Sequence, residues 1–147
     1  MKKLLVILCL IFPTVIFAQK WEACNNGLEN IRTESITSKD NYIFAGTDSI
    51  EVYRSPDLGK SWEAVNNGLY KADGHIISME MIDNTVLALN WYSGVYISEN
   101  MGENWGRINN IDTMGGISVG CLTTAKNEIY VGQSGSVHAS YDKGDHW

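Results

Sequence analysis

An acidic or amide side chain recurs at one position of a repeated motif, and its chemistry has two interpretations. The motif is Ser-x-Asp/Asn-x-Gly-x-x-Trp, and the recurring side chains are Asp57, Asn100 and Asp142. A carboxylate at this position could act as a general acid or base. It can instead accept hydrogen bonds from backbone N–H groups two or more residues further on and so fix a tight turn. Because a position copied in every repeat is typical of architecture, we predict the turn.

The other residues of the motif also fit a turn. Glycine provides a positive φ where a side chain would clash, serine can make a second local hydrogen bond, and tryptophan then covers the hairpin with a large apolar face. The predicted structural residues are Ser55, Asp57, Gly59, Trp62, Ser98, Asn100, Gly102, Trp105, Ser140, Asp142, Gly144 and Trp147.

The histidines and cysteines do not form a metal-binding pattern. His138, Asp142 and His146 have helical spacing, but the motif places them across a strand and a turn. The sequence also lacks a phosphate-binding glycine loop, so we predict no metal and no cofactor. Cys24 and Cys121 lie far apart in the repeat order. We favour two buried free thiols, and a disulfide between them is the alternative.

The motif is part of a longer internal repeat. Four tryptophans, at positions 21, 62, 105 and 147, follow one another at intervals of about 42 residues. Between them, runs of β-branched and aromatic residues alternate with Gly, Asn, Asp and Ser, which is typical of short strands and turns. Four short strands in about 40–45 residues is the period of a propeller blade.

The repeat predicts an all-β propeller of four-stranded antiparallel blades, with about three blades and an incomplete ring. Its repeats span about residues 21–62, 62–105 and 105–147. No segment after residue 18 shows the 3.6-residue period of a capped helix. The predicted strands are 34–38, 42–46 and 50–55 in the first repeat, 78–82, 85–89 and 94–98 in the second, and 120–124, 128–132 and 136–140 in the third. A fourth strand is expected to start near Trp62 and near Trp105, whereas the third blade lacks its outer strand.

The first 18 residues have the pattern of a secretory signal peptide. A basic start is followed by an almost wholly apolar run, residues 4–17, and by the small Ala18. This run is shorter than the roughly 20 residues of a membrane anchor. We therefore predict cleavage after Ala18 and a secreted or periplasmic domain, residues 19–147, without a transmembrane segment. The net charge of −6 argues against nucleic acid as a partner.

The repeated motif resembles the Asp-box, or BNR repeat, of sialidase-like propellers. The Trp-x-x-x-Asn-x-Gly-Leu segment after Trp21 and Trp62 is similar to that of a wider set, which includes photosystem assembly factor-like proteins, sortilin-type receptors and xyloglucan-active glycoside hydrolases. The resemblance covers residues 21–147. It implies that the motif turns are peripheral and structural and lie away from the ligand face. Because these relatives differ in activity, it implies no single function.

The family layout also implies which loops form the ligand face, namely those from the second to the third strand and from the fourth to the first. Trp91 and Tyr92 are the candidate ligand contacts there, because aromatic rings at a loop tip can stack on a sugar or on a partner side chain. The alternative is that both rings pack against the neighbouring blade.

Catalytic candidates on this face are weak. Glycosidases use two carboxylates roughly 5–10 Å apart, and Asp48, Asp73 and Asp112 are the acidic residues in these loops that could form such a pair. A sialidase would need an arginine cluster for its substrate carboxylate, whereas only Arg32 of the three arginines lies in a ligand-face loop.

We therefore expect an exported, non-catalytic propeller that serves as a binding or assembly scaffold for a protein or a glycan. The alternative is the N-terminal fragment of a secreted glycoside hydrolase, sialidase-like or xyloglucan-active, with catalytic residues mostly in missing blades. A cell-surface adhesion module is a third class. Propellers carry about four to eight blades, so we expect a piece of a longer protein or, as the alternative, self-association. Residues 21–28 could close the third blade. The chain alone should expose apolar blade faces and unpaired edges.

Overall fold

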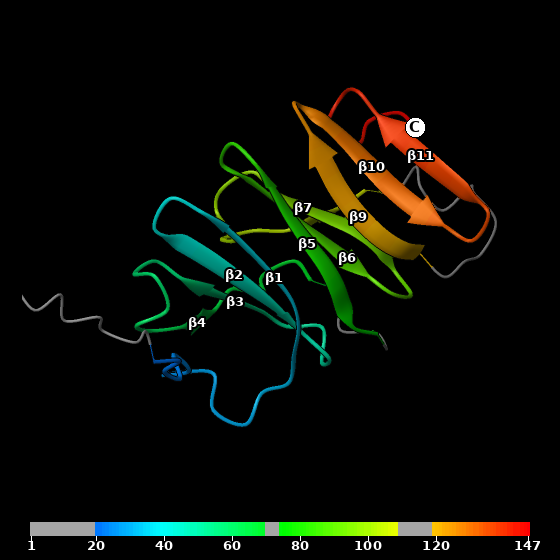
Figure 1. Cartoon of the computed structure of the whole chain (residues 1–147). Coiled ribbons are helices and arrows are strands. Elements are labelled where there is room, and N and C mark those ends of the chain that lie inside the picture. The colour runs from blue at the N-terminus through cyan, green and yellow to red at the C-terminus, as the bar shows by residue number, and fades with distance from the viewer. Residues whose placement is uncertain (1–19, 70–73, 109–118) are drawn as a thin grey trace, which may run out of the picture.

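The computed structural model describes residues 20–69, 74–108 and 119–147, and these residues form strands and turns without a helix. Figure 1 shows three antiparallel sheets stacked side by side in chain order. We call them blades 1, 2 and 3. Among the described residues, no helix is long and apolar enough to cross a membrane.

Each blade is a meander in which neighbouring strands in the chain are neighbours in the sheet. Blades 1 and 2 have four strands each, and the described part of blade 3 has three. Blade 1 contains β1 (Thr33–Lys39), β2 (Tyr42–Thr47), β3 (Val52–Ser55) and β4 (Glu63–Ala64). Blade 2 contains β5 (Ile76–Ile82), β6 (Thr85–Asn90), β7 (Gly94–Ser98) and β8 (Gly106–Arg107). Blade 3 contains β9 (Val119–Ala125), β10 (Glu128–Gln133) and β11 (Ser136–Ser140).

The predicted strands agree with these elements to within two residues. β5 begins earlier than the expected residue 78, at Ile76. The third strand of blade 1 was expected from residue 50, but β3 begins at Val52. Ile50 adopts a left-handed backbone with φ 61° in the preceding turn. A β-branched residue rarely adopts this conformation and usually favours a strand, so the sequence predicted a strand at Ile50.

The innermost strands of neighbouring blades lie side by side, in the order β1, β5, β9. Ser35 Oγ of β1 donates a 2.6 Å hydrogen bond to the carbonyl of Ile76. At the equivalent position of the next repeat, Ser78 Oγ donates to the carbonyl of Leu122 at 3.2 Å. At both interfaces the serine at this repeat position donates to a backbone carbonyl of the following inner strand.

The hydrophobic core lies between the blades. Each of its two clusters joins the face of one blade to the opposite face of the next, so neither sheet buries its apolar side chains alone. The cluster between blades 1 and 2 includes Phe44, Val52, Val65, Ile76, Met79, Val86, Ala88, Tyr96 and Trp105. The cluster between blades 2 and 3 includes Leu87, Leu89, Val95, Ile108, Leu122, Ile129 and Val131.

The two terminal faces of the stack expose apolar side chains, as predicted. Val137 of blade 3 is 73% exposed, whereas Val95, at the same repeat position in blade 2, is 0% exposed. Ile36 of blade 1 is 67% exposed, whereas its equivalent Met79 is 4% exposed. Both residues stand where a neighbouring blade would cover them.

Residues 21–28 lie beside blade 1, so the expected closure of blade 3 by this segment is wrong for this structure. The backbone N–H of Trp62 donates to the carbonyl of Asn26 at 2.9 Å, and the backbone N–H of Trp105 donates to the carbonyl of Asn67 at 2.8 Å. The segments after Trp21 and Trp62 thus each bind the motif tryptophan of the next repeat. Residues 21–28 follow this rule, and this position keeps them away from β11.

Cys24 and Cys121 are free, as predicted, but both are exposed, so the predicted burial is wrong. Cys121 occupies the repeat position of Ser35 and Ser78, whose hydroxyls reach the following blade. In blade 3 this face is uncovered, which leaves Cys121 accessible. Cys24 belongs to the segment that lies beside blade 1, and its side chain remains exposed there.

Candidate functional site

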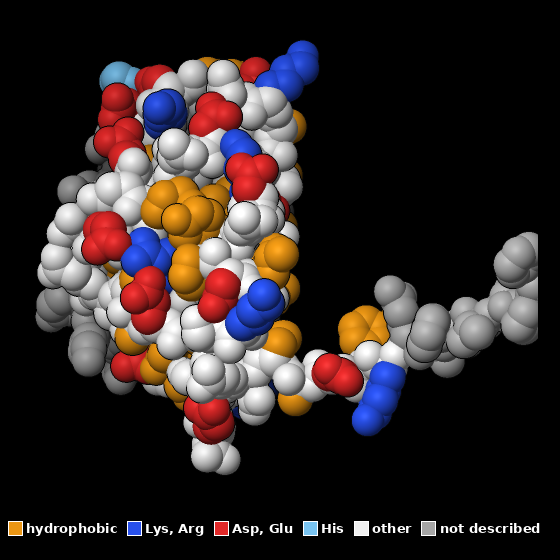
Figure 2. Space-filling model, turned by 90° about the vertical axis from the view of Figure 1, so that its left-hand side faces the viewer, with side chains coloured by type: hydrophobic (Ala, Val, Ile, Leu, Met, Phe, Trp, Pro, Cys, Tyr) orange, Lys and Arg blue, Asp and Glu red, His pale blue; other side chains and the backbone are white. Residues whose placement is uncertain are grey.

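The motif turns and the candidate ligand loops lie at opposite ends of the blades, because successive strands are antiparallel. The turns after β3, β7 and β11 share one end with the hairpins between the first two strands of each blade, at the left in Figure 1. Figure 2 shows this end, where hydrophobic side chains gather among acidic and basic ones. The loops β2–β3, β6–β7 and β10–β11 lie at the other end, together with the starts of the inner strands.

The three motif turns use the same hydrogen bonds. In blade 1, Ser55 Oγ donates to Asp57 Oδ1 at 2.9 Å and accepts from the Gly59 N–H at 2.8 Å. Asp57 Oδ1 also accepts from the Ser61 N–H at 2.9 Å. The corresponding bonds in blade 2 are 2.9, 2.8 and 2.9 Å, and those in blade 3 are 2.9, 2.7 and 2.9 Å. Each Asp or Asn side chain of the motif is thus engaged within its own turn.

These bonds also lower the pKa of the motif carboxylates. The Ser61 hydroxyl and the Ser61 N–H hold the pKa of Asp57 below its usual value of 3.8. In the third turn, the His146 N–H and the His146 ring lower the pKa of Asp142 to about 2. A carboxylate that stays ionised in this way is a poor general acid at neutral pH.

The loop between β6 and β7 carries the two aromatic candidates on a fixed frame. Asn90 is fully buried, and its Oδ1 accepts from the N–H groups of Tyr92 and Ser93 at 2.9 and 2.8 Å. The Trp91 N–H donates to the carbonyl of His75 at 3.0 Å. Despite this frame, Tyr92 is 70% exposed and Trp91 is 40% exposed. Tyr92 is therefore mostly exposed to solvent, whereas Trp91 is partly covered.

Three polar side chains lie at the same end, across the boundary between blades 1 and 2. The His75 ring contacts the Glu34 carboxylate, with 3.1 Å between Nδ1 and Oε2. The other carboxylate oxygen of Glu34 lies 3.6 Å from Arg32 Nη2. Because the Trp91 N–H binds the His75 carbonyl, the aromatic tip and this charged chain form one surface. We call these five residues, Arg32, Glu34, His75, Trp91 and Tyr92, the rim cluster.

The equivalent loop of blade 1 has the same frame with a different tip. Thr47, also fully buried, accepts from the Ser49 and Glu51 N–H groups at 3.3 and 3.1 Å through its Oγ1. The Asp48 N–H donates to the carbonyl of Arg32 at 3.2 Å, as Trp91 does to His75. A similar set of hydrogen bonds thus holds a loop with Asp48 and Ser49 at its tip.

The structure places one of the three carboxylate candidates. Asp48 lies in the β2–β3 loop, where Ser49 Oγ donates to its Oδ1 at 3.3 Å. Asp73 and Asp112 lie outside the described residues, and so do most of the other residues of the loops that lead to β5 and β9. Among the described residues, no group of three or more His, Cys, Asp or Glu side chains is placed to hold a metal ion.

Sequence reasoning singled out Trp91, Tyr92 and Arg32 but missed the contact of His75 with Glu34. The available signal was positional, because Arg32 and His75 both directly precede an inner strand and so share a repeat position. Sequence reasoning also missed the contact of Arg54 with the motif turn of the next blade. The Met101 carbonyl is 47 positions from Arg54 in the sequence, and Glu34 is 41 positions from His75.

The stacked four-stranded antiparallel blades define a β-propeller, and comparison with solved structures confirms this fold class. No family model matches the chain, and no curated protein matches it. A structure described as YCF48 bound to D1 peptide superposes with a TM-score of 0.71 at 15% identity, over 80% of this chain and 40% of that one.

Two further propellers are similar. YCF48 from Cyanidioschyzon merolae gives a TM-score of 0.61 at 18% identity, over 78% of this chain and 37% of that chain. The GH74 xyloglucanase from Xanthomonas campestris gives 0.60 at 15% identity, over 78% and 23%. This chain therefore spans about two-fifths or less of these three proteins. At such identities the likeness establishes the fold and leaves function to the site.

Proposed function

We propose that this chain is part of an exported, non-catalytic β-propeller that binds an extended segment of another protein at the rim cluster. The observation that carries the proposal is the pair Trp91 and Tyr92, which is exposed at the tip of a loop whose backbone is held by a buried asparagine. Export rests on the signal-peptide pattern of residues 1–18.

A fixed aromatic tip is suited to binding because little order has to be created when a ligand arrives. Side chains such as tryptophan and tyrosine dominate the energetics of protein interfaces. Rigidity before binding reduces the entropy lost on association. Both conditions hold at the β6–β7 loop, since three backbone N–H groups of the tip are hydrogen-bonded to Asn90 or to the His75 carbonyl.

Folding gives no reason for aromatic residues at this tip. The β2–β3 loop closes on the same kind of frame with Asp48 and Ser49 at the tip. The exposed apolar surface of Trp91 and Tyr92 is therefore a cost to solubility that a ligand contact would explain.

The charged residues beside the tip favour a peptide as the ligand. Arg32 and His75 offer hydrogen-bond donors and Glu34 offers an acceptor within one short chain of contacts. A peptide backbone presents both carbonyl and N–H groups, so it can use both kinds of partner. The YCF48 structure with a bound D1 peptide supports the same class of ligand for a propeller of this fold.

The test is selection of a phage-displayed random peptide library on the wild-type protein, followed by fluorescence polarisation with the enriched peptides. We expect the double variant W91A/Y92A to weaken binding at least tenfold, because central aromatic contacts contribute about 2 kcal/mol or more. The matched control is D48A/S49A in the β2–β3 loop, which should stay within about twofold of wild type. Thermal unfolding of both variants checks that the fold is intact.

Two outcomes would overturn the proposal. Equal peptide affinities of W91A/Y92A and wild type would show that Trp91 and Tyr92 are not part of the binding site. Hydrolysis of xyloglucan or of chromogenic glycosides by the wild-type protein would favour the glycoside hydrolase alternative, for which the GH74 likeness supplies the fold.

A further inference from the structure

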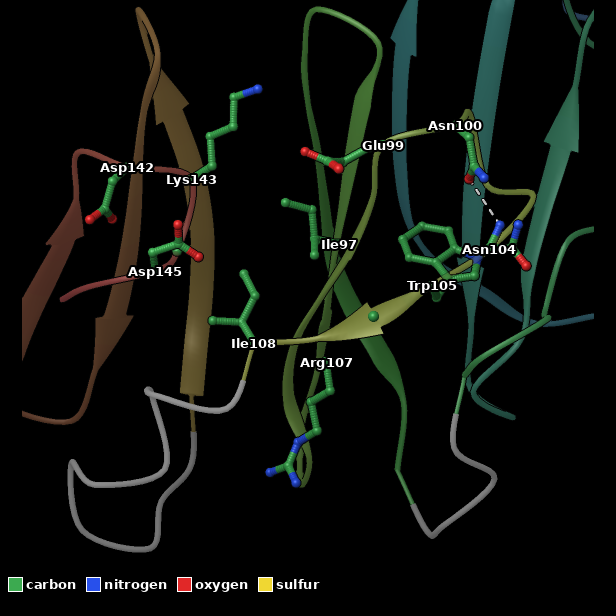
Figure 3. Close-up of a pocket in the computed structure, with 12 residues that line it drawn as sticks. Ile97, Glu99, Asn100, Asn104, Trp105, Arg107, Ile108, Asp142, Lys143 and Asp145 are labelled. Carbon is green, nitrogen blue, oxygen red and sulfur yellow. Dashed lines mark hydrogen bonds between the residues drawn. The ribbon is translucent and has the colours of Figure 1, made fainter.

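A groove of about 710 Å³ separates blades 2 and 3 at the end that carries the motif turns. Its apolar lining comes from blade 2, where Ile97, Trp105 and Ile108 face the gap (Figure 3). Its other wall is the third motif turn, residues 142–145. Glu99 extends into the space between the two walls. The groove lies at the opposite end of the blades from the rim cluster.

An arginine of this chain occupies the equivalent place between blades 1 and 2. Arg54 of β3 donates to Glu63 Oε1 through Nε and Nη2, at 2.9 and 2.7 Å. Its Nη1 donates to the carbonyl of Met101, at 2.7 Å, and its Nη2 lies 2.8 Å from Glu103 Oε1. Met101 and Glu103 belong to the second motif turn. The guanidinium group therefore bridges the outer strands of one blade and the motif turn of the next.

These contacts favour the charged guanidinium although the side chain is largely buried. Burial alone would lower the pKa of Arg54, but its hydrogen bonds to Glu63 and Glu103 outweigh this effect and raise the pKa above its usual value. A planar fork of N–H donors matches a carboxylate and a carbonyl better than an ammonium does.

The repeat explains why the second groove is open. Ile97 stands at the repeat position of Arg54, and Gly106 stands at that of Glu63. In the opposite wall, Asp145 stands at the position of Glu103, and Lys143, which also lines the groove, stands at the position of Met101. Blade 2 has thus lost the arginine and its first carboxylate, while the turn that receives the arginine retains its acceptors.

We propose that the groove between blades 2 and 3 binds an arginine side chain of a partner peptide, which takes the place that Arg54 takes between blades 1 and 2. The incoming guanidinium would contact the third motif turn on one side and Glu99 on the other. Its methylene groups would lie along Ile97, which is partly exposed in the groove. This site is separate from the rim cluster and does not depend on it.

The first experiment titrates three peptides into ¹⁵N-labelled protein: Gly-Gly-Arg-Gly-Gly, the lysine analogue and the citrulline analogue, all with blocked ends. We expect the amide signals of Gly106 and Gly144 to shift with the arginine peptide at millimolar concentration. Shifts with lysine should saturate at least fivefold later, and citrulline should leave the signals in place. Absence of shifts with arginine, or equal affinities for arginine and lysine, would overturn the proposal.

The second experiment rebuilds the occupied arrangement. The variant I97R/G106E copies Arg54 and Glu63 into blade 2 and should abolish the shifts, because the groove is then filled from within. V137R is the control, since it adds an arginine at an exposed position of blade 3 and should leave binding within twofold. Unchanged binding to I97R/G106E would overturn the proposal.

E99Q keeps the test decisive if the double variant does not fold. Glu99 is exposed, so the substitution should not disturb the blades. We expect it to weaken the arginine peptide about three- to tenfold, since it removes one carboxylate from the groove. An unchanged affinity of E99Q would contradict the proposed contact.

Discussion

Trp105 Nε1 donates a 2.7 Å hydrogen bond to the carbonyl of Val65, which directly follows the outer strand of the preceding blade. The same bond joins Trp62 Nε1 to the carbonyl of Cys24 at 2.8 Å. In both cases the acceptor lies three residues after the previous motif tryptophan. Trp62 and Trp105 thus tie their own blades to the segment that precedes each blade, whereas the Nε1 of Trp147 is buried without a hydrogen-bond partner.

Replacement of Trp105 by phenylalanine should destabilise the protein measurably. The bond from Trp105 is buried, so its loss leaves the Val65 carbonyl without that partner and should cost about 1–3 kcal/mol. The matched variant is Trp62→Phe, whose bond to Cys24 is exposed and should cost less than 1 kcal/mol or so. Urea unfolding of both variants measures the difference, and equal losses would contradict the role of burial.

Replacement of Gly102 by alanine should show how closely the motif turn approaches the preceding blade. A Cβ there would lie 3.0 Å from Val65 Cγ2 and 3.1 Å from Phe44 Cε1, on a backbone with φ 89°. Gly135 is the control, because it has φ 85° and no atom within 4 Å of a Cβ. We expect Gly135→Ala to cost about 1 kcal/mol from backbone strain and Gly102→Ala to cost about 1–3 kcal/mol more from overpacking. Chemical denaturation checks this, and similar losses would show that the interface yields freely.

Replacement of Ser55 by alanine should test the turn hydrogen bonds. Ser55 is fully buried, and its Oγ accepts from the Gly59 N–H at 2.8 Å. Without this acceptor a buried N–H group loses its partner, so we expect a loss of about 1–3 kcal/mol. Ser61→Ala, which removes a partly exposed bond to Asp57, should cost less. If the two variants unfold at the same denaturant concentration, Ser55 does not have the role assigned here.

The pair Asp142 and His146 should make stability depend on pH at both ends of the range. The lowered pKa of Asp142, about 2, stabilises the folded state above pH 3.8, and this contribution is lost as the pH falls towards 2. The hydrogen bond and charge of Asp142 raise the pKa of His146 above 6.5. That contribution is present below pH 6.5 and is lost as the pH rises through the raised value.

Titration of the His146 ring by NMR measures this directly. Asp142→Asn should return the His146 pKa towards 6.5, because it removes both the main hydrogen bond and its charge. Asp145→Asn should lower it only slightly, since Asp145 acts on His146 through charge alone. The explanation fails if the two substitutions have equal effects.

The strands and their order could be predicted because their signals are local and repeated. Tyr42, Thr85 and Glu128 each begin a second strand directly after an aligned asparagine, and three copies of one pattern reinforce each other. The backbone of the motif turns was only partly predictable. Leu58, Met101 and Lys143 have φ near 60°, directly before the glycine. Their residue types do not reveal this, because the turn imposes the conformation.

The candidate site was predictable where exposure alone mattered and not where two blades meet. Trp91 and Tyr92 stand out because the equivalent loops of the other repeats have no aromatic residues at their tips. The contact of His75 with Glu34 joins residues 41 positions apart. It exists because the inner strands β1 and β5 lie side by side, and no feature of either residue indicates the other.

The sequence by itself determined the repeat, the antiparallel blades and the turn chemistry, since each depends on residues within one repeat. The tertiary structure decided what each repeat position faces. Val95 and Val137 occupy the same position, yet one is buried and the other is exposed. Arg54 joins two blades, while Ile97 leaves a groove at the equivalent place. The physical reason is that a blade buries its faces only against another blade, so contacts between repeats set burial, charge pairing and open space.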